Sequence, residues 1–552
     1  MSDQQKRDAW LLCPAMPDEL SAQLSSMDDN TVHDCFYRDL SFGTGGLRGV
    51  LGAGTNRMNV FTVLKATRGL GRYLLESFDR PSCAVSFDSR IHSEDFARFT
   101  AAALAEMGIP VWIYPRLQPT PMLSFAVRHL SVSAGVMITA SHNPSRFNGY
   151  KVYGADGCQI TLEAARLIQE KIDSQPVLSD SLPSFDHFLS SGLIRFITDD
   201  TIEAYYQSVW KLRVKPSVHP LHVVYSPLNG TGNIPVREIL RRMGNVTVDI
   251  VAEQELPNGR FPTCPSPNPE IREAMDLAID KTISTGADLC IATDPDCDRM
   301  GAGVRAGNDV ILISGNDMGI LMLDYLCRNR SCSGPLPFVV VKTIVTTEMA
   351  SALCNQYNIE LRNVLTGFKY IGEQIGILEA AGQKDRFLFG FEESYGYLSG
   401  TDVRDKDAVN AVLLLCDMAA ELKSEGKTLL DRLSELREQY GFYAQRLLTY
   451  EYSGEAGAVQ MGLIMKRLRS PLNGFDDIRI QNAVRTDYLH DVTGLPQSDV
   501  LFFRLSDSDQ FVIRPSGTEA KLKAYLFVRA GNAADADIRL DKLQQLVDLL
   551  CT

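Results

Sequence analysis

The chain has 552 residues, which is too long for one hydrophobic core and predicts roughly three or four domains. Hydrophobic residues make up 45% of it and charged residues 22%, as in ordinary soluble globular proteins. The formal net charge of −13 argues against nucleic acid or an anionic membrane as a partner, although a locally basic pocket can still bind a small anionic substrate.

The cysteines and the apolar runs indicate a cytoplasmic protein. Twelve cysteines are scattered without a CxxC pair, which indicates neither a disulfide framework nor a zinc site. The N-terminus is charged and is broken by Pro14 and Pro17, unlike a signal peptide. No uncharged run has the length of a membrane span, since even residues 408–420 include Asp417.

Residues 1–40 are predicted to be helical and polar, and a glycine-rich loop over 40–49 follows them. Backbone amides in such a loop can approach a phosphate closely, and Arg48 can add a bidentate contact. The loop lacks the Lys-Ser/Thr pair of a P-loop. It also lacks the preceding strand and the ribose-binding acid of a dinucleotide site.

The stretch 135–151 predicts a buried strand that ends in a turn carrying a hydroxyl. An apolar run, residues 136–138, stops abruptly and exposes Ser141. Pro144 disfavours helix, and the pair at 148–149 predicts a second turn that returns Lys151 towards the serine. Taken alone, an ordinary connecting turn is the better interpretation, so the other segments decide.

A strand-turn-helix-strand pattern occurs three times, over residues 83–114, 221–251 and 338–364. Such βαβ units build parallel sheets with helices on both faces. Each unit is followed by another apolar strand that ends in a polar loop. These loops begin at Ser141, Asp294 and Glu392.

The repeated position of these loops predicts a shared cleft. In open α/β sheets, ligands bind beyond the carboxyl ends of the strands. Coincidence among common βαβ patterns is the less favoured explanation, because all three loops follow the same strand of their unit. We therefore expect three similar α/β domains, with mixed or mostly parallel sheets, to direct one loop each at a central cleft.

The tail of the chain lacks the βαβ rhythm and predicts a smaller C-terminal α+β domain. It has strand patterns at 446–449 and 501–505, and helical patterns at 457–469 and 535–550. The predicted domain bounds are 1–212, 213–310, 311–441 and 442–552.

The second loop carries three carboxylates at alternating positions, which can converge on one cation. Hard oxygen ligands favour Mg²⁺ or Ca²⁺. An EF-hand is excluded, because Arg299 and Arg305 stand where that loop needs glycine and glutamate. A solvated acidic turn is the alternative, but the apolar flanks favour a partly buried metal site. The three residues are Asp294, Asp296 and Asp298.

Two further loops have the donors and acceptors of a sugar-phosphate site. Residues 390–396 offer carboxylates and a hydroxyl that suit sugar hydroxyls. Residues 514–518 combine an arginine, two hydroxyls and a glycine amide, a compact donor set for a phosphate. A helix expected after Glu519 would add a favourable dipole. A plain helix cap is the alternative interpretation of this last segment.

The four loops, in this order over nearly the whole chain, resemble those of the α-D-phosphohexomutase superfamily of phosphoglucomutases and phosphomannomutases. Residues 42–49, 154–157 and 257–262 are most similar to the branch that holds phosphopentomutases, glucose 1,6-bisphosphate-related enzymes and bacterial phosphoglucomutases. The resemblance implies a mutase that interconverts glucose 1-phosphate and glucose 6-phosphate. The reaction would pass through a phosphoserine and a bisphosphorylated sugar, with Mg²⁺ as cofactor and glucose 1,6-bisphosphate as activator.

The resemblance also implies roles for residues. Lys151 is the candidate for proton transfer, since a lysine beside cations can have a lowered pKa. His142 shares that role or orients the serine. The implied catalytic set is Arg48, Ser141, His142, Lys151 and Arg299; the metal set is Ser141, Asp294, Asp296 and Asp298; the substrate set is Thr366, Gly367, Phe368, Glu392, Ser394, Lys406, Arg514, Ser516, Gly517 and Thr518.

Other functions stay open at this point. Mannose, glucosamine and pentose phosphates are alternative substrates, so phosphomannomutase and phosphopentomutase activity remain candidates. A phosphatase with an aspartate nucleophile is disfavoured, because Asp298 stands where its motif needs Thr or Val. A non-catalytic sugar-phosphate sensor is the other class. The fourth domain is expected to close over the cleft, and the oligomeric state is undetermined.

Overall fold

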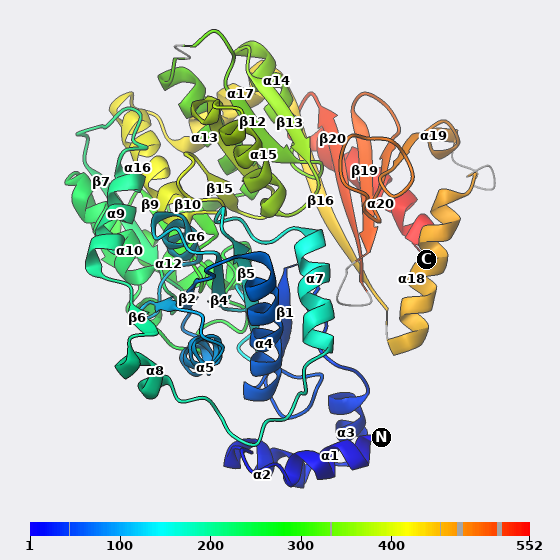
Figure 1. Ribbon diagram of the computed structural model, residues 1–552. Coiled ribbons are helices and arrows are strands. Elements are labelled where there is room, and N and C mark those ends of the chain that lie inside the picture. The colour runs from blue at the N-terminus through cyan, green and yellow to red at the C-terminus, as the bar shows by residue number, and fades with distance from the viewer. Residues whose placement is uncertain (44, 332–333, 453, 472–477, 516–520, 552) are drawn as a thin grey trace.

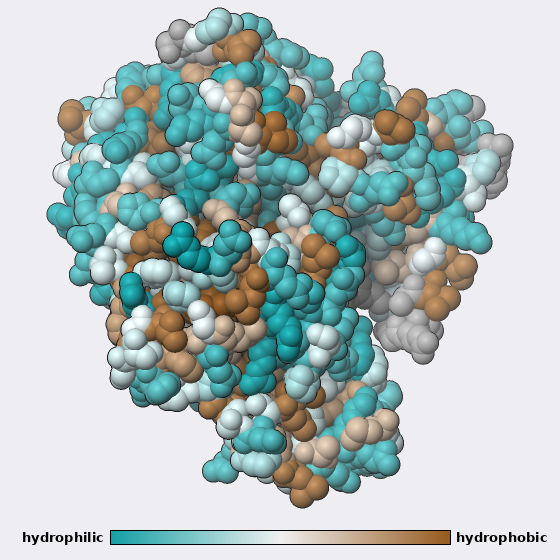
Figure 2. Space-filling model, in the orientation of Figure 1, coloured by the Kyte–Doolittle hydropathy of each residue, from teal (hydrophilic) through white to brown (hydrophobic). Residues whose placement is uncertain are grey.

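Four β-sheets organise the molecule (Figure 1). The computed structural model describes residues 1–552 except 44, 332–333, 453, 472–477, 516–520 and 552. Within that part of the chain, no helix is both long and apolar enough to cross a membrane. The face in Figure 2 is mainly hydrophilic, with apolar residues scattered in small groups.

Three short helices precede the first sheet, as the sequence predicts. Ser2 starts the first with a capping box, in which its hydroxyl and the Gln5 side chain satisfy each other's backbone amides. Trp10 then packs edge-on against Phe36 and Phe61 and buries this layer against the first domain. The helices are α1 (Asp3–Leu11), α2 (Asp18–Ser26) and α3 (Asp29–Phe36).

The first sheet is mixed, because β5 pairs antiparallel with both of its neighbours, the edge strand β1 and β4. The other strands pair in parallel. Its spatial order is β1 (Gly46–Val50), β5 (Phe147–Gly154), β4 (Ala134–Ile138), β2 (Cys83–Phe87), β3 (Val111–Ile113) and β6 (Ile194–Phe196). Its helices are α4 (Val60–Ser77), α5 (Ser93–Glu106), α6 (Thr120–His129), α7 (Leu162–Asp173), α8 (Phe185–Ser191) and α9 (Asp199–Trp210).

The second sheet repeats this plan, with a parallel centre and antiparallel strands at one side. It runs β11 (Asp309–Ile313), β10 (Met300–Ala306), β9 (Leu289–Thr293), β7 (Leu221–Ser226) and β8 (Val246–Ile250). Its helices are α10 (Asn233–Met243), α11 (Ala252–Glu255) and α12 (Arg272–Thr285). The predicted domain bound at residue 310 falls inside β11, so this sheet extends slightly beyond it.

The third sheet has four strands, with only β15 antiparallel. It runs β13 (Glu360–Val364), β12 (Val339–Thr343), β14 (Phe387–Glu392) and β15 (Gly396–Leu398). Around it lie α13 (Gly315–Asn329), α14 (Met349–Gln356), α15 (Phe368–Ala380), the 3₁₀ turn η1 (Lys384–Arg386), α16 (Ala408–Ser424) and α17 (Leu429–Tyr440). All three βαβ repeats are confirmed.

The C-terminal domain is a fully antiparallel sheet that stands beside the rest of the molecule in Figure 1. It runs β16 (Phe442–Glu451), β20 (Lys521–Ala530), β19 (Asp509–Pro515), β18 (Leu501–Arg504) and β17 (Val484–Asp487). Its helices are α18 (Gly454–Arg469), α19 (Ile478–Gln481) and α20 (Ala533–Cys551). The α/β class and the smaller fourth domain are confirmed.

Two local predictions are wrong. The chain continues from Lys521 as strand β20, not as a helix, because its backbone pairs on both sides, with β16 and with β19. The expected turn at 148–149 lies inside β5. There Asn148 is buried, with its amide donating to the Ser93 hydroxyl at 3.1 Å. The chain reverses earlier, and Lys151 still returns beside β4.

Candidate active site

The predicted loops meet at one cavity, of about 670 Å³, beyond the carboxyl ends of β4, β9 and β14. Asp294 and Asp296 are buried behind its wall. Ser516, Gly517 and Thr518 fall outside the described residues. The predicted site residues that line the cavity are Arg48, Ser141, His142, Lys151, Asp298, Arg299, Thr366, Gly367, Phe368, Glu392, Ser394, Lys406 and Arg514.

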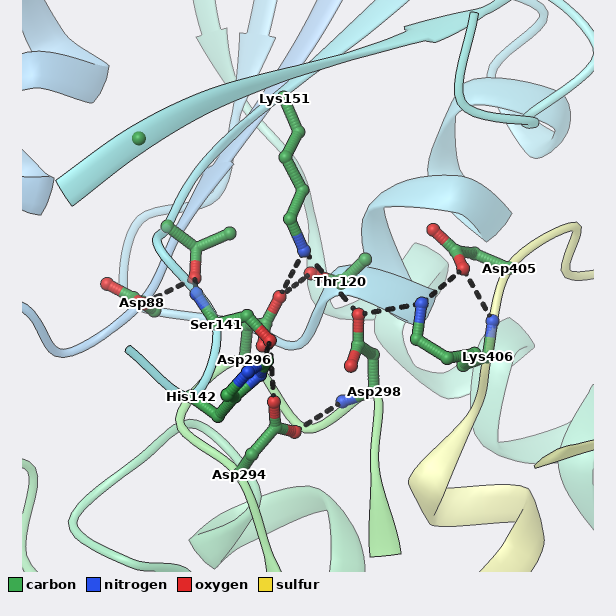
Figure 3. A network of polar contacts seen from close by, with 12 residues as sticks. Asp88, Thr120, Ser141, His142, Lys151, Asp294, Asp296, Asp298, Asp405 and Lys406 are labelled. Carbon is green, nitrogen blue, oxygen red and sulfur yellow. Dashed lines mark hydrogen bonds and ion pairs between the residues drawn. The ribbon is translucent and has the colours of Figure 1, made fainter. Parts of the chain in front are cut away.

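Ser141 lies at the tip of the loop after β4 and faces the acidic loop of the second domain (Figure 3). Its backbone is left-handed, with φ of 53°, which turns the hydroxyl away from the strand. The Ser141 Oγ donates to Asp294 Oδ2 at 2.8 Å and lies 3.3 Å from His142 Nδ1. A nucleophile from one domain and a carboxylate from another therefore meet at hydrogen-bonding distance.

The three aspartates form a compact set of oxygen donors. One oxygen from each lies within 4.8 Å of the others, and all three side chains are buried. Burial, and then repulsion from Asp296 and Asp298, raises the pKa of Asp294 well above its usual range. Two buried oxygens, Asp296 Oδ1 and Asp298 Oδ1, have no hydrogen-bond partner. Converging carboxylates with orphaned oxygens fit a hard divalent cation.

Two lysines contact the triad from the other side (Figure 3). Lys151 Nζ is 2.7 Å from Asp296 Oδ2, and Lys406 Nζ is 3.2 Å from Asp298 Oδ2. The expectation of a lowered lysine pKa is wrong: burial favours lowering it, but the two aspartates outweigh burial and raise the pKa of Lys151. The expectation failed because the carboxylates that face this lysine outweigh the effect of the neighbouring cation Lys406. Burial and then Arg299 instead hold the pKa of His142 well below its ordinary value.

Two arginines flank the serine and the triad. Arg48 Nη1 donates to Asn143 Oδ1 at 3.3 Å. Arg48 lies in strand β1, which takes up the second half of the predicted glycine-rich loop because it pairs with β5, so this strand reaches the serine loop. Arg299 Nη1 donates to Glu270 Oε1 at 2.6 Å, while its backbone amide donates to Asp294 Oδ1. Fixed guanidinium groups at the cavity wall favour an anionic ligand such as a phosphate.

The third and fourth domains supply the opposite wall. Glu392 Oε1 accepts from the Gly367 amide at 3.0 Å, which joins two of the predicted sugar-contacting segments. Lys406 lies over the Phe368 ring, 5.4 Å from its centroid. From the C-terminal domain, Arg514 on β19 and Lys523 on β20 face the cavity. Burial and then Arg514 lower the pKa of Lys523.

Several residues of the site escaped the sequence reasoning. Glu270 and Lys523 belong to segments without a distinctive pattern, and only the fold brings them to the cavity. Asp88 and Arg90 follow β2 and contact the serine loop. Their position after a parallel strand was a usable signal, since strand ends in such sheets border ligand sites.

The buried carboxyl group of Glu393 is expected to make the stability of the protein depend on pH. Burial and then Glu392 raise its pKa from 4.5 to about 8. Above pH 4.5 the unfolded chain releases this proton while the folded protein keeps it, so this group makes folding less favourable as the pH rises towards 8. The free energy of unfolding of Glu393→Gln, relative to that of the wild type, should therefore increase as the pH rises from about 5 to about 8. Urea unfolding midpoints of the wild type and of Glu393→Gln, measured at both pH values, check this. An equal difference between the two midpoints at the two pH values would contradict it.

A serine hydroxyl, an acidic triad and a cation-lined cavity between repeated α/β/α domains define a class of enzyme that transfers phosphoryl groups on small molecules. Models of the phosphoglucomutase/phosphomannomutase α/β/α domains I, II and III match residues 39–177, 203–307 and 314–440. The matches follow the order of the three repeats.

Known proteins resemble the chain over nearly its full length. It is 37% identical to a phosphoglucomutase of Staphylococcus haemolyticus, over 95% of this chain and 97% of that protein. It is 36% identical to a phosphoglucomutase of Staphylococcus saprophyticus, over 89% of this chain and 91% of that protein. The open form of Paramecium parafusin, a phosphoglucomutase, shares the fold with a TM-score of 0.69, 18% identity and coverage of 93% and 95%. The chain belongs to the phosphoglucomutase/phosphomannomutase family and is an isomerase that transfers phosphoryl groups.

Proposed function

We propose that this protein interconverts glucose 1-phosphate and glucose 6-phosphate through a phosphoserine at Ser141. The observation that carries the proposal is the meeting of the Ser141 hydroxyl with Asp294, at 2.8 Å, beside a cavity lined by cations. The phosphoglucomutases of two Staphylococcus species, similar to the chain over most of its length, support glucose as the sugar.

In this proposal, the phosphoryl group moves from phosphorylated Ser141 to a hydroxyl of the bound hexose phosphate, which yields glucose 1,6-bisphosphate. The intermediate turns over in the cavity, and the serine recovers a phosphoryl group from the other end. Lys151 or His142 moves the proton at the sugar hydroxyl. Arg48 and Arg299 neutralise the transferring group.

The remaining predicted residues hold the metal and the substrate. Asp294, Asp296, Asp298 and Ser141 would bind Mg²⁺, which stabilises charge on a transferring phosphoryl group. Two orphaned carboxylate oxygens support this assignment. The idle phosphate would lie against Arg514, Ser516, Gly517 and Thr518, and the hexose against Thr366, Gly367, Phe368, Glu392, Ser394 and Lys406. The cytoplasm is the proposed location, in keeping with the free thiols of the described cysteines.

A substrate panel tests the proposal. With Mg²⁺ and glucose 1,6-bisphosphate present, glucose 1-phosphate should have a kcat/KM at least about 10-fold above those of mannose 1-phosphate, glucosamine 1-phosphate and ribose 1-phosphate, because hydroxyls and substituents are read by hydrogen bonds. Preference for another sugar would contradict the glucose assignment. Net phosphate release would indicate a phosphatase, and binding without turnover would indicate a sensor.

A further inference from the structure

One buried arginine binds the backbone of the serine loop along its whole length. The side chain of Arg90 has no exposed surface. Its Nη1 donates to the carbonyls of Pro144 and Phe147, each at 3.0 Å, and its Nη2 donates to those of Ser141 and Asn143. A planar guanidinium suits this task because its donors have a fixed geometry.

The amide side of the same turn is held through Asp88. The Ser141 amide donates to Thr139 Oγ1 at 2.8 Å, and that hydroxyl donates to Asp88 Oδ2 at 2.6 Å. Asp88 also accepts from the Arg90 amide at 2.9 Å, and Arg90 Nε lies 3.3 Å from it. Both sides of the Ser141 peptide are therefore tied to the turn after β2.

The second domain covers this arginine. The Phe261 ring lies against the guanidinium, with 5.1 Å from its centroid to Arg90 Cζ. Phe261 is buried and has a left-handed backbone, with φ of 46°. Gly259 pairs with Arg90 in a bridge so close that an added Cβ would lie 2.4 Å from the Ile91 amide. Residues 257–262, which the sequence singles out without a task, thus dock behind the serine loop.

We propose that Arg90, with Phe261 against its face, is a positioning residue that fixes the Ser141 hydroxyl against the acidic triad. The serine belongs to the first domain, whereas the triad and Phe261 belong to the second. The Arg90–Phe261 contact therefore holds the two halves of the phosphoryl-transfer site in register. Arg90 acts through the backbone of the loop and does not contact substrate. The inference rests on the proposed role of Ser141.

Kinetics of Arg90→Lys test this role. Lysine keeps the charge but cannot supply the rigid fork of donors. We expect kcat to fall on the order of 10- to 100-fold, because displacement of a nucleophile by about 1 Å reduces the rate of the chemical step by a factor of this order. KM for glucose 1-phosphate should stay within about twofold, since the sugar and idle phosphate are held by other domains. Transfer from glucose 1,6-bisphosphate to Ser141, followed by rapid quench and intact mass, should slow in parallel.

Phe261→Leu supplies a second, milder variant. Its kcat should fall less than that of Arg90→Lys. The double variant should resemble Arg90→Lys alone, because both changes act through one guanidinium. If Arg90→Lys does not fold, Phe261→Leu decides: a wild-type kcat and a wild-type rate of Ser141 phosphorylation would overturn the proposal.

Arg213→Lys is the matched control. Arg213 lies over the Trp210 ring, 4.6 Å from its centroid, and pairs with both Asp417 oxygens, at 2.8 and 2.5 Å. It joins the end of α9 to α16, and within the described part of the chain the hydrogen-bond and ion-pair partner of its side chain is Asp417, not a residue of the serine loop. Arg213→Lys should lose stability with kcat unchanged. A wild-type kcat for folded Arg90→Lys would overturn the inference, whereas a wild-type protein without phosphoserine would overturn the proposed function instead.

Discussion

Ser141→Ala is expected to abolish mutase turnover, with a loss on the order of 10⁴-fold or more in kcat, because it removes the group that receives the phosphoryl. The wild type, incubated with glucose 1,6-bisphosphate, should gain the mass of one phosphoryl group, and phosphatase treatment should remove it. The variant should show no gain. Its fold should survive, since Ser141 Oγ makes one hydrogen bond to Asp294 and one contact to His142.

Ser394→Ala is the comparison for this experiment. It deletes another hydroxyl of the same cavity but leaves the serine loop intact. We expect weaker substrate binding with the mass gain retained. A phosphoryl group that still attaches to Ser141→Ala would show that another residue is the nucleophile, and the proposed mechanism would then be wrong.

Asp296→Asn should abolish the response to Mg²⁺ in both stability and activity. Metal that binds only the folded state stabilises it, by about 2.7 kcal/mol at a hundredfold excess over Kd. Relief of repulsion among three buried carboxylates is the physical source of this gain. The wild-type Tm should therefore rise with Mg²⁺ and fall reversibly with a chelator. In Asp296→Asn we expect no rise, and a kcat reduced by about 10³-fold.

Asp405→Asn is the control for this experiment. It distinguishes the loss of metal binding from the general effect of removing a buried acidic side chain. Asp405 is buried nearby, where it accepts from Lys406 and from the Tyr153 hydroxyl at 2.8 Å, but it is not one of the three clustered aspartates. This variant should keep the Mg²⁺-dependent rise in Tm. An equal rise in Asp296→Asn and the wild type would place the metal elsewhere.

The carboxylates of the acidic triad explain why the pKa of Lys151 was wrongly predicted from the local sequence. The sequence led us to expect a lowered pKa for Lys151, as for a lysine beside cations. The fold instead brings β5, with Lys151, and the segment before α16, with Lys406, to the acidic loop, where the two lysines face Asp296 and Asp298. The pKa of Lys151 is consequently raised. Partners from distant segments, and not the residues adjacent in sequence, set the charge state.

Sequence alone determined the three βαβ repeats, the distinct C-terminal domain and the polar loops after β4, β9 and β14 that border the cavity. These features are local: apolar periodicity defines each strand and helix, and polar residues at strand ends mark each loop. Tertiary structure alone decided which residues orient the loops, because Arg90, Phe261 and Glu270 act on partners far away in the chain. It also decided that the segment from Lys521 onward joins a sheet, since strand pairing depends on neighbours that periodicity does not reveal.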